Sequence, residues 1–336
     1  MEPEKVRAPN IRDVAKLAGV SYQTVSRVLN ESPNIRPSTK ERVLDVIEQI
    51  GFQPNQAARA LVTNRSRTIG VLSGDTAHYG PTTSVHAIEL AARQADYRVM
   101  ITNTSSDYES IRSSLDSLRQ QAVEAIVIIA PQVRVFDAIA DMNLTIPFVT
   151  LDSTQRDTSR SMSVDQFAGG RLATRHLIDL GHQEIEHVAG PQDWIEADAR
   201  MRGFLHEINE ADLTTRPPIL GDWTAAFGHH AGRELLRHPD FTAVFCANDQ
   251  MALGLMHALH EGGVRVPQDV SVVGFDDIPD AAHLWPPLTT VRQDFAEIGR
   301  RALAILLDEI TGSTDARHDQ IAPELIVRSS TAPPSR

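Results

Sequence analysis

Two short amphipathic stretches joined by a glycine constrain the start of the chain more tightly than any other feature. Residues 11–18 and 22–29 each carry apolar side chains at helical spacing. Gly19 between them permits a tight turn, Val20 can fill the angle between two helices, and Ser21 is a favoured residue at a helix start. The spacing predicts a helix-turn-helix.

A third helix is expected immediately after this motif. Ser38 and Glu41 have the spacing of a capping box, in which each side chain caps the other residue's backbone N–H. Gly51 is a typical residue just beyond a helix end. The apolar stripe of this helix consists of Val43, Val46, Ile47 and Ile50. Together the three helices predict a small all-α head.

The second helix of the motif leaves polar side chains on its outer side. Tyr22, Gln23 and Arg27 face away from the stripe that contains Val25 and Val28. In a helix-turn-helix the second helix lies in the major groove of DNA, where Gln can bond adenine and Arg can bond guanine through paired hydrogen bonds. The alternative is three solvated side chains on a surface helix. The compact turn pattern favours base recognition.

Charge is divided unevenly along the chain. Residues 1–67 contain eleven Lys and Arg against seven Asp and Glu, a net of +4. The whole chain carries −12, so the remainder carries −16. A basic module on an acidic body is typical of a DNA-binding head fused to a regulatory domain, although a short window can also be basic by chance.

Composition and cysteine usage narrow the class of protein. Apolar residues make up 41% and charged residues 23%, as in globular proteins. The first nine residues lack the apolar core of a signal peptide and no run is long enough to span a bilayer, so we expect a cytoplasmic protein without a membrane partner. The single cysteine, Cys246, excludes a disulfide framework, and we expect a buried inert thiol rather than a redox sensor.

From Thr68 onward, short β-branched runs alternate with amphipathic stretches. This alternation predicts an α/β body of two doubly wound parallel sheets with helices on both faces. The expected strands are 69–73, 97–102, 125–129, 147–151, 184–189, 243–247 and 270–275. The expected helices include 82–95, 108–121, 165–180, 194–210, 223–237 and 248–262.

Polar side chains follow several of these expected strands. Asp152, Asn248 and Asp276 come after three of them, and Arg200 lies on the helix after a fourth. Ligands in doubly wound folds bind outside the carboxyl ends of strands, and these groups suit a polyhydroxylated ligand. The alternative for each Asp or Asn is a helix cap or a turn residue. We prefer that alternative for Asp249 and Asp277.

Residues 13–30, DVAKLAGVSYQTVSRVLN, resemble the signature of the LacI/GalR family of bacterial transcriptional regulators. Residues 247–254, 269–277 and 287–295 resemble motifs of that family's effector domain. The resemblance covers essentially the whole chain and implies a two-lobed body like that of periplasmic sugar-binding proteins. The implied divisions are a helix-turn-helix head (1–53), a hinge helix and linker (54–67), a first lobe (68–164 with about 293–320) and a second lobe (165–292 with about 321–332).

The resemblance implies DNA contacts from both the head and the hinge. The head residues are Ser21, Tyr22, Gln23, Thr24, Ser26, Arg27 and Asn30. The hinge residues are Asn55, Ala58, Arg59 and Leu61. In the family, paired hinges order on the operator and insert leucines into the minor groove, which kinks the DNA. The hinge is too short to persist alone as a helix, and a plain linker with Leu61 packed on the body is the alternative.

By the same resemblance, the effector-binding residues are Asp152, Arg200, Trp223, Asn248, Asp276 and Phe295. Trp223 would stack against the apolar face of a sugar, the alternative being a half-buried core tryptophan. Trp194 and Glu196 depart from the small residues found elsewhere in the family. They either line the cleft and change its specificity, in which case Trp194 joins the effector set, or lie on its rim.

The resemblance thus implies a repressor that binds a pseudo-palindromic double-stranded operator and is released by a small inducer, a mono- or oligosaccharide. A corepressor-type regulator that binds DNA when loaded with a purine-like ligand is the alternative. No cofactor or metal is expected, and no catalytic motif such as Gly-x-Ser-x-Gly or a P-loop occurs, so we expect no enzyme. Residues 329–336 lack the apolar heptads of a tetramerising tail, so a homodimer is expected.

Overall fold

The computed structural model describes residues 9–29, 32, 34–52, 65–74, 78–105, 107–129, 135, 139, 144–151 and 160–335. By its internal contacts the chain divides into two units, Met1–Ser66 and Arg67–Arg336, which we call the head and the body. Among the described helices, none has the length and apolarity that crossing a membrane requires.

The described part of the head contains three helices, α1 (Ile11–Ala18), α2 (Tyr22–Leu29) and α3 (Pro37–Ile50). Gly19 and Gly51 end α1 and α3 in the left-handed conformation, with φ of 64° and 63°. The helices enclose one apolar core, which confirms the expected helix-turn-helix and its supporting helix. The buried core side chains are Val14, Ala15, Ala18, Val25, Val28, Val43, Val46 and Phe52.

The capping box expected at Ser38 and Glu41 is wrong. Helix α3 begins earlier, at Pro37, and the preceding Arg36 makes no side-chain capping hydrogen bond. Proline suits this first position because its missing N–H would have no partner within the helix. The capping box of the head lies instead at α1, where the Asn10 side chain accepts from the Asp13 N–H and the Asp13 carboxylate accepts from the Asn10 N–H.

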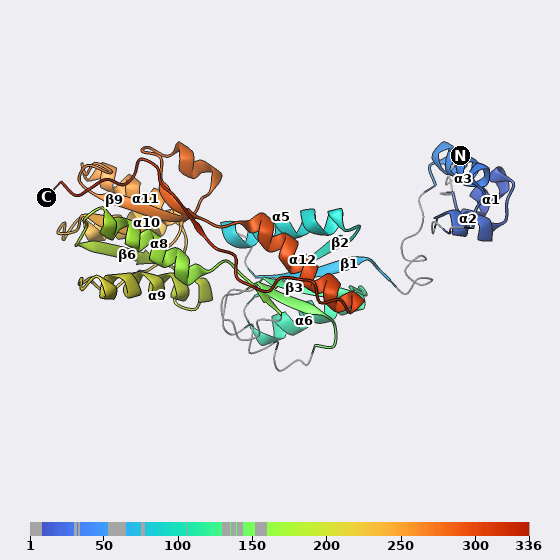
Figure 1. Ribbon diagram of the computed structural model, residues 1–336, viewed down its shortest axis with the longest axis horizontal. Coiled ribbons are helices and arrows are strands. Elements are labelled where there is room, and N and C mark those ends of the chain that lie inside the picture. The colour runs from blue at the N-terminus through green and yellow to red at the C-terminus, as the bar shows by residue number, and fades with distance from the viewer. Residues whose placement is uncertain are drawn as a thin grey trace, which may run out of the picture. The chain divides into compact units, whose positions relative to one another are not determined.

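The first lobe of the body contains a five-stranded parallel sheet in the order β2-β1-β3-β4-β5 (Figure 1). Its strands are β1 (Thr68–Ser73), β2 (Arg98–Asn103), β3 (Ala125–Ile129), β4 (Phe148–Leu151) and β5 (Ser161–Met162). Its helices are α5 (Tyr79–Gln94), α6 (Tyr108–Gln120) and α12 (Phe295–Thr311). Side chains of β1 alternate between two cores, with Ile69 and Val71 under α5 and α12 and Leu72 under α6.

The second lobe contains a six-stranded sheet in the order β11-β10-β9-β8-β6-β7, in which only the edge strand β11 is antiparallel. Its strands are β6 (Ile185–Ala189), β7 (Ile219–Leu220), β8 (Ala243–Cys246), β9 (Ser271–Asp276), β10 (Thr289–Arg292) and β11 (Glu324–Ile326). Its helices are α8 (Gln166–Asp179), α9 (Ile195–Glu210), α10 (Ala225–Leu235) and α11 (Asp249–Glu261), with a short 3-10 helix, η1 (Pro279–His283). Phe204 on α9 marks one core of the lobe, and Leu255 on α11 marks the other.

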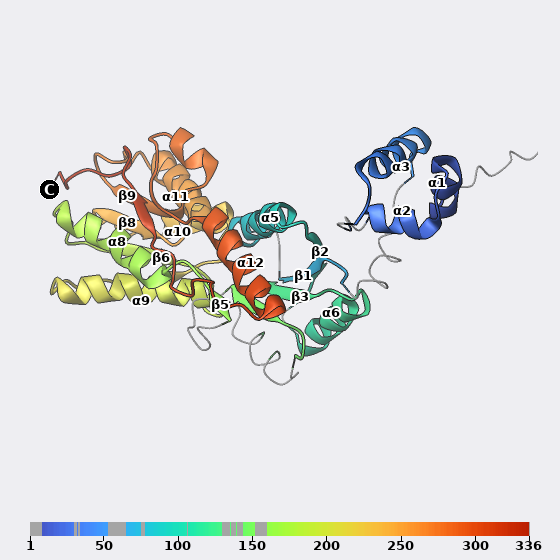
Figure 2. The ribbon, with the colours of Figure 1, turned by 45° about the vertical axis from the view of Figure 1, so that its right-hand side comes forward.

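These two sheets confirm the predicted fold class. All seven expected strands form, and their ends agree to within two residues. In the described chain, the lobes are joined by residues 163–165, 293–294 and 312–323, of which the last two flank α12 (Figure 2). A bridge between Val164 and Ile321 pairs two of these segments. The chain therefore passes between the lobes at a single place, beside the carboxyl ends of the strands.

Candidate ligand pocket and DNA-facing helix

A pocket that is partly open to solvent lies between the two lobes of the body. The first lobe contributes the start of α5 and Phe295 at the start of α12, and the second lobe contributes α9 and the carboxyl end of β9. The predicted effector residues that line it are Arg200, Trp223, Asn248, Asp276, Phe295 and Trp194. Asp152 lies outside the described residues.

A closed ring of four buried polar side chains forms the floor of the pocket. Arg200 Nε donates to Gln166 Oε1 (2.8 Å), and Gln166 Nε2 donates to Gln293 Oε1 (2.7 Å). Gln293 Nε2 donates to Asp276 Oδ1 (2.6 Å), which lies 3.6 Å from Arg200 Nη2. Each of these residues is more than nine-tenths buried. The ring satisfies most of the polar capacity of its members and fixes the orientation of both amides.

Burial dominates the electrostatics of this ring. Burial raises the pKa of Asp276 to about 6, although the nearby Arg200 and the hydrogen bond from Gln293 act in the opposite direction. The Arg200 guanidinium also donates to the Ala247 carbonyl and lies 3.8 Å from the centroid of the Phe275 ring. Arginine keeps its charge at this depth, so the pocket floor holds one cation against a carboxylate of raised pKa.

Aromatic side chains form the pocket walls. Trp194 lies 5.3 Å, ring centre to ring centre, from both Trp223 and His78, and Tyr79 lies 5.8 Å from Phe295. Trp223 is only 6% exposed, and it both packs in the core of the second lobe and faces the pocket. Its Nε1–H is buried and finds no hydrogen-bond partner among the described residues. The pocket therefore offers flat apolar faces to a ligand.

The lack of a side chain at Gly190 leaves the space that the Trp223 ring occupies. A Cβ atom at Gly190 would lie 2.2 Å from the indole, so no larger residue fits at the end of β6 without displacing the ring. Trp223 itself has a φ of 71°, which a bulky residue rarely adopts. Such strain is typical of functional sites, where surrounding contacts hold an unfavourable backbone in place.

Asn248 combines the two roles weighed for it, pocket residue and helix cap, whereas Asp249 does not take the cap role. Asn248 caps α11, because its Oδ1 accepts from the Met251 N–H (2.9 Å), while its Nδ2 donates to the Trp223 carbonyl (3.0 Å). The cap role expected for Asp249 is therefore wrong. Asp249 is fully buried and accepts from the Ile278 N–H (2.9 Å) and Thr290 Oγ1 (2.6 Å).

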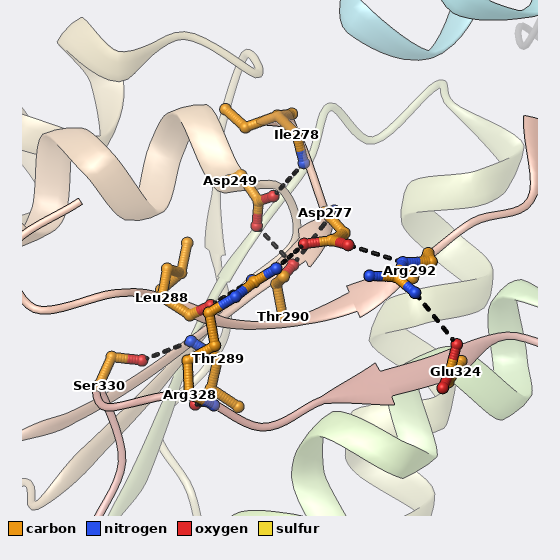
Figure 3. A network of polar contacts seen from close by, with 10 residues as sticks. All are labelled: Asp249, Asp277, Ile278, Leu288, Thr289, Thr290, Arg292, Glu324, Arg328 and Ser330. Carbon is orange, nitrogen blue, oxygen red and sulfur yellow. Dashed lines mark hydrogen bonds and ion pairs between the residues drawn. The ribbon is translucent and has the colours of Figure 1, made fainter. Parts of the chain in front are cut away.

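Asp277 belongs to the same structural network as Asp249 (Figure 3). Its φ of 53° fits the turn role expected for it. Its carboxylate also accepts from Arg292 Nε (2.7 Å) and Arg328 Nη2 (2.6 Å), which ties β9 to β10 and to the C-terminal segment. Burial raises the pKa of Asp249 well above its ordinary value. These two acids hold the second lobe together and do not line the pocket.

Sequence reasoning left one question open and did not single out two members of the polar ring. Trp194 and Glu196 both line the pocket, which resolves their placement in favour of the cleft. The two ring members that were not predicted are Gln166 and Gln293. The two glutamines border the segments between the lobes, so they meet only in the folded chain. Only their position next to an expected crossover could have indicated them.

The outer face of α2 presents the predicted DNA-contacting residues. Tyr22 is 57% exposed, and Gln23 and Arg27 are also exposed. Ser21 Oγ accepts from the Thr24 N–H (3.1 Å), which confirms Ser21 as the residue that caps α2. Thr24 and Ser26 are half-buried. The remaining predicted contacts, Asn30, Asn55, Ala58, Arg59 and Leu61, lie outside the described residues.

Comparison with protein families gives two matches on this chain. Residues 10–55 match the model described as bacterial regulatory proteins, lacI family, and residues 174–331 match a periplasmic binding protein-like domain. The HTH-type transcriptional repressor PurR of Haemophilus influenzae (strain PittEE) is 35% identical over 331 residues, which cover 95% of this chain and 98% of the relative. PurR of Pasteurella multocida is 33% identical with the same coverage.

Solved structures match over nearly the whole chain as well. The lac repressor dimer bound to operator and the anti-inducer ONPF has a TM-score of 0.89 and 32% identity, covering 97% of this chain and all of that one. A complex of the transcriptional regulator CelR with cellobiose has a TM-score of 0.71 and 30% identity, covering 96% and 99%. The likeness extends through head and body together.

Proposed function

The chain belongs to the lacI family of bacterial regulatory proteins and is a DNA-binding transcriptional repressor, and we propose that a neutral sugar-like inducer in the pocket between its lobes releases it from DNA. The relatives are named as repressors rather than enzymes, and a solved relative is a dimer on its operator. We accordingly assign the chain a homodimeric state on a pseudo-palindromic operator and place it in the cytoplasm, with its target DNA.

The observation that carries the proposal is the combination of a buried polar ring with aromatic walls. Sugar hydroxyls both donate and accept hydrogen bonds, so they match the polar side chains of Arg200, Asn248 and Asp276 in the pocket lining. The C–H faces of a sugar ring stack on aromatic side chains such as Trp223 and Phe295. Few precisely placed polar groups in an apolar cavity are typical of small-molecule sites.

The charge of the pocket favours a neutral ligand. Asp276 and Glu196 contribute carboxylates to its lining, and Arg200 is the nearby cation. Arg200 is already engaged by Gln166, the Ala247 carbonyl and Asp276. A phosphorylated sugar or an acidic metabolite would bring a further negative charge, and the described lining residues include no second arginine or lysine to receive it, which is costly in a buried site. An unmodified mono- or oligosaccharide avoids that cost.

The pocket can couple to the head because its walls come from both lobes. Phe295 and Tyr79 belong to the first lobe, whereas Arg200, Trp223 and Asp276 belong to the second. A ligand that contacts both lobes favours the lobe arrangement in which those contacts form together. The first lobe begins with β1 directly after the predicted hinge, so a change in lobe orientation would alter the spacing of two hinges in a dimer.

A purine-like corepressor is the second candidate. The curated relatives at 32–35% identity are PurR repressors, and flat aromatic walls also suit a planar base. The two candidates predict opposite responses. A sugar inducer weakens operator binding when it occupies the pocket, whereas a corepressor strengthens operator binding.

A thermal-shift screen followed by DNA binding tests the proposal. The full chain is heated with neutral mono- and disaccharides, their phosphates, and purine bases, because a ligand that binds the native state raises the Tm. We expect a neutral sugar to raise the Tm and to weaken binding to an operator selected from random duplexes. A purine that raises the Tm and strengthens DNA binding would establish the corepressor instead, and a sugar phosphate as the preferred ligand would refute the charge argument.

A further inference from the structure

We propose that the paired helices α10 and α11 carry a binding site for a divalent transition-metal ion, formed by His229, His257 and Glu261. This site is separate from the ligand pocket, since none of the three residues lines it. It does not depend on the identity of the inducer.

The three side chains converge from two helices. His257 and Glu261 lie one turn apart on α11 and share a face, while His229 approaches from α10. His229 Nε2 lies 2.8 Å from Glu261 Oε2, and His257 Nε2 lies 3.5 Å from Glu261 Oε1. One potential ligand atom from each residue lies within 4.8 Å of the others. Ligand atoms around a tetrahedral zinc ion are about 3.3 Å apart, so small side-chain rotations bring all three into range.

The helices beneath these side chains are held in close contact. A Cβ atom at Gly254 would lie 1.8 Å from the Ala225 carbonyl oxygen, and one at Gly228 would lie 2.0 Å from the Met251 carbonyl oxygen. The two backbones therefore touch, which leaves little freedom for α10 and α11 to slide past each other. Ligands on such rigid helices are better positioned for a metal than ligands on loops.

The donor set selects the class of ion. Two imidazoles and one carboxylate suit Zn²⁺, Co²⁺, Ni²⁺ or Cu²⁺, whereas Mg²⁺ and Ca²⁺ prefer oxygen ligands alone. The side chains of His229, His257 and Glu261 are 28%, 62% and 52% exposed, so an ion can enter from solvent and retain water at a fourth position. Arg233 also lies near the Glu261 carboxylate and competes for it, which points to moderate rather than extreme affinity.

Isothermal titration of the untagged full chain with Zn²⁺ alone tests this proposal. We expect one saturable site per chain and a raised Tm in its presence. His229→Ala and His257→Ala should each weaken binding at least tenfold. His260→Ala is the matched control, because His260 is an exposed histidine on α11 outside the cluster, and it should bind zinc like the wild type.

Two further measurements separate this site from adventitious binding. Millimolar Mg²⁺ should not displace the zinc, and operator binding by the His257→Ala variant should remain normal, which shows that the variant is folded. The proposal is overturned if no saturable binding occurs, if the His229→Ala/His257→Ala double variant binds zinc like the wild type, or if Mg²⁺ displaces the ion.

Discussion

Asp276 links burial to ligand binding at the scale of a single residue. Burial raises its pKa to about 6, with Arg200 and Gln293 opposing the shift. Acidification through that value protonates the carboxylate, which weakens its interaction with Arg200 and turns one of its acceptor oxygens into a donor. We therefore expect inducer affinity to fall about tenfold at roughly one pH unit below the pKa, when measured by titration calorimetry.

The free energy of unfolding should change with pH in the direction opposite to inducer affinity. A carboxyl whose pKa is raised in the native state binds its proton more tightly there than in the unfolded chain. Its contribution to the free energy of unfolding is thus greatest below the unfolded pKa of about 3.9 and is lost as the pH rises through about 6. Asp276→Asn should remove the pH dependence of inducer affinity and reduce that of stability, to which the buried Asp249, whose pKa is also raised, still contributes. An inducer affinity that stays constant between about pH 5 and pH 7.5 in the wild type would contradict the assignment of Asp276 as an ionised ligand-binding group.

Gln23 and Arg27 are predicted to read bases from the exposed face of α2. Replacing either with Ala should relax base preference at one operator position by about 1–3 kcal/mol, measured with a panel of single-base operator variants. Lys40→Ala on α3 is the control, because it removes a charge without touching the α2 face and should weaken binding evenly across sequences. Unchanged base preference in both α2 variants would refute the assignment.

Sequence analysis placed single residues best where both the residue type and its position relative to a strand indicated a binding site. Arg200 and Asp276 combine an unusual residue type with a place after a strand, and both reach the pocket. Asn248 and Asp249 are adjacent polar residues, and sequence alone could not tell which one caps α11 and which one is buried. The difference depends on Ile278 after β9 and Thr290 on β10, which meet Asp249 only when the second lobe has folded.

At the scale of elements, the close contact between α10 and α11 depends on glycine. Gly254→Ala would place a methyl group against the Ala225 backbone, so the helices must separate. We expect a loss of about 1–3 kcal/mol in the free energy of unfolding, measured by urea denaturation. Gly80→Ala is the control, since its Cβ would meet only the Phe295 ring, at 4.0 Å. Equal stability of the two variants would show that α10 and α11 can separate without loss of stability.

The shortest strands were missed by sequence analysis. β5 and β7 contain two residues each and β11 contains three, which is too few to show a period of two. β10 (Thr289–Arg292) lies within residues 287–295, which were interpreted only as a family motif, and the 17-residue helix α12 was not among the expected helices. Longer strands such as β1 and β3 were predicted because continuous apolar runs are typical of buried parallel strands.

At the scale of the whole molecule, the arrangement of the body depends on contacts between distant segments. α12 follows the second lobe in sequence but packs beside α5 in the first. Alternation of strands and helices predicts two sheets, yet it does not specify which lobe receives α12. The family resemblance supplied that assignment. The pocket depends on it, because Phe295 at the start of α12 faces Arg200 and Asp276 across the lobe boundary.

The central claim is that occupation of this pocket changes DNA binding. Fluorescence anisotropy of a labelled operator, with and without a saturating inducer, measures this directly in the wild type and in Arg200→Lys, which keeps the charge but loses the planar hydrogen-bonding fork. We predict that inducer weakens wild-type operator binding at least tenfold, whereas Arg200→Lys binds the operator normally and does not respond. An inducer that demonstrably fills the wild-type pocket while operator affinity stays the same would contradict the account.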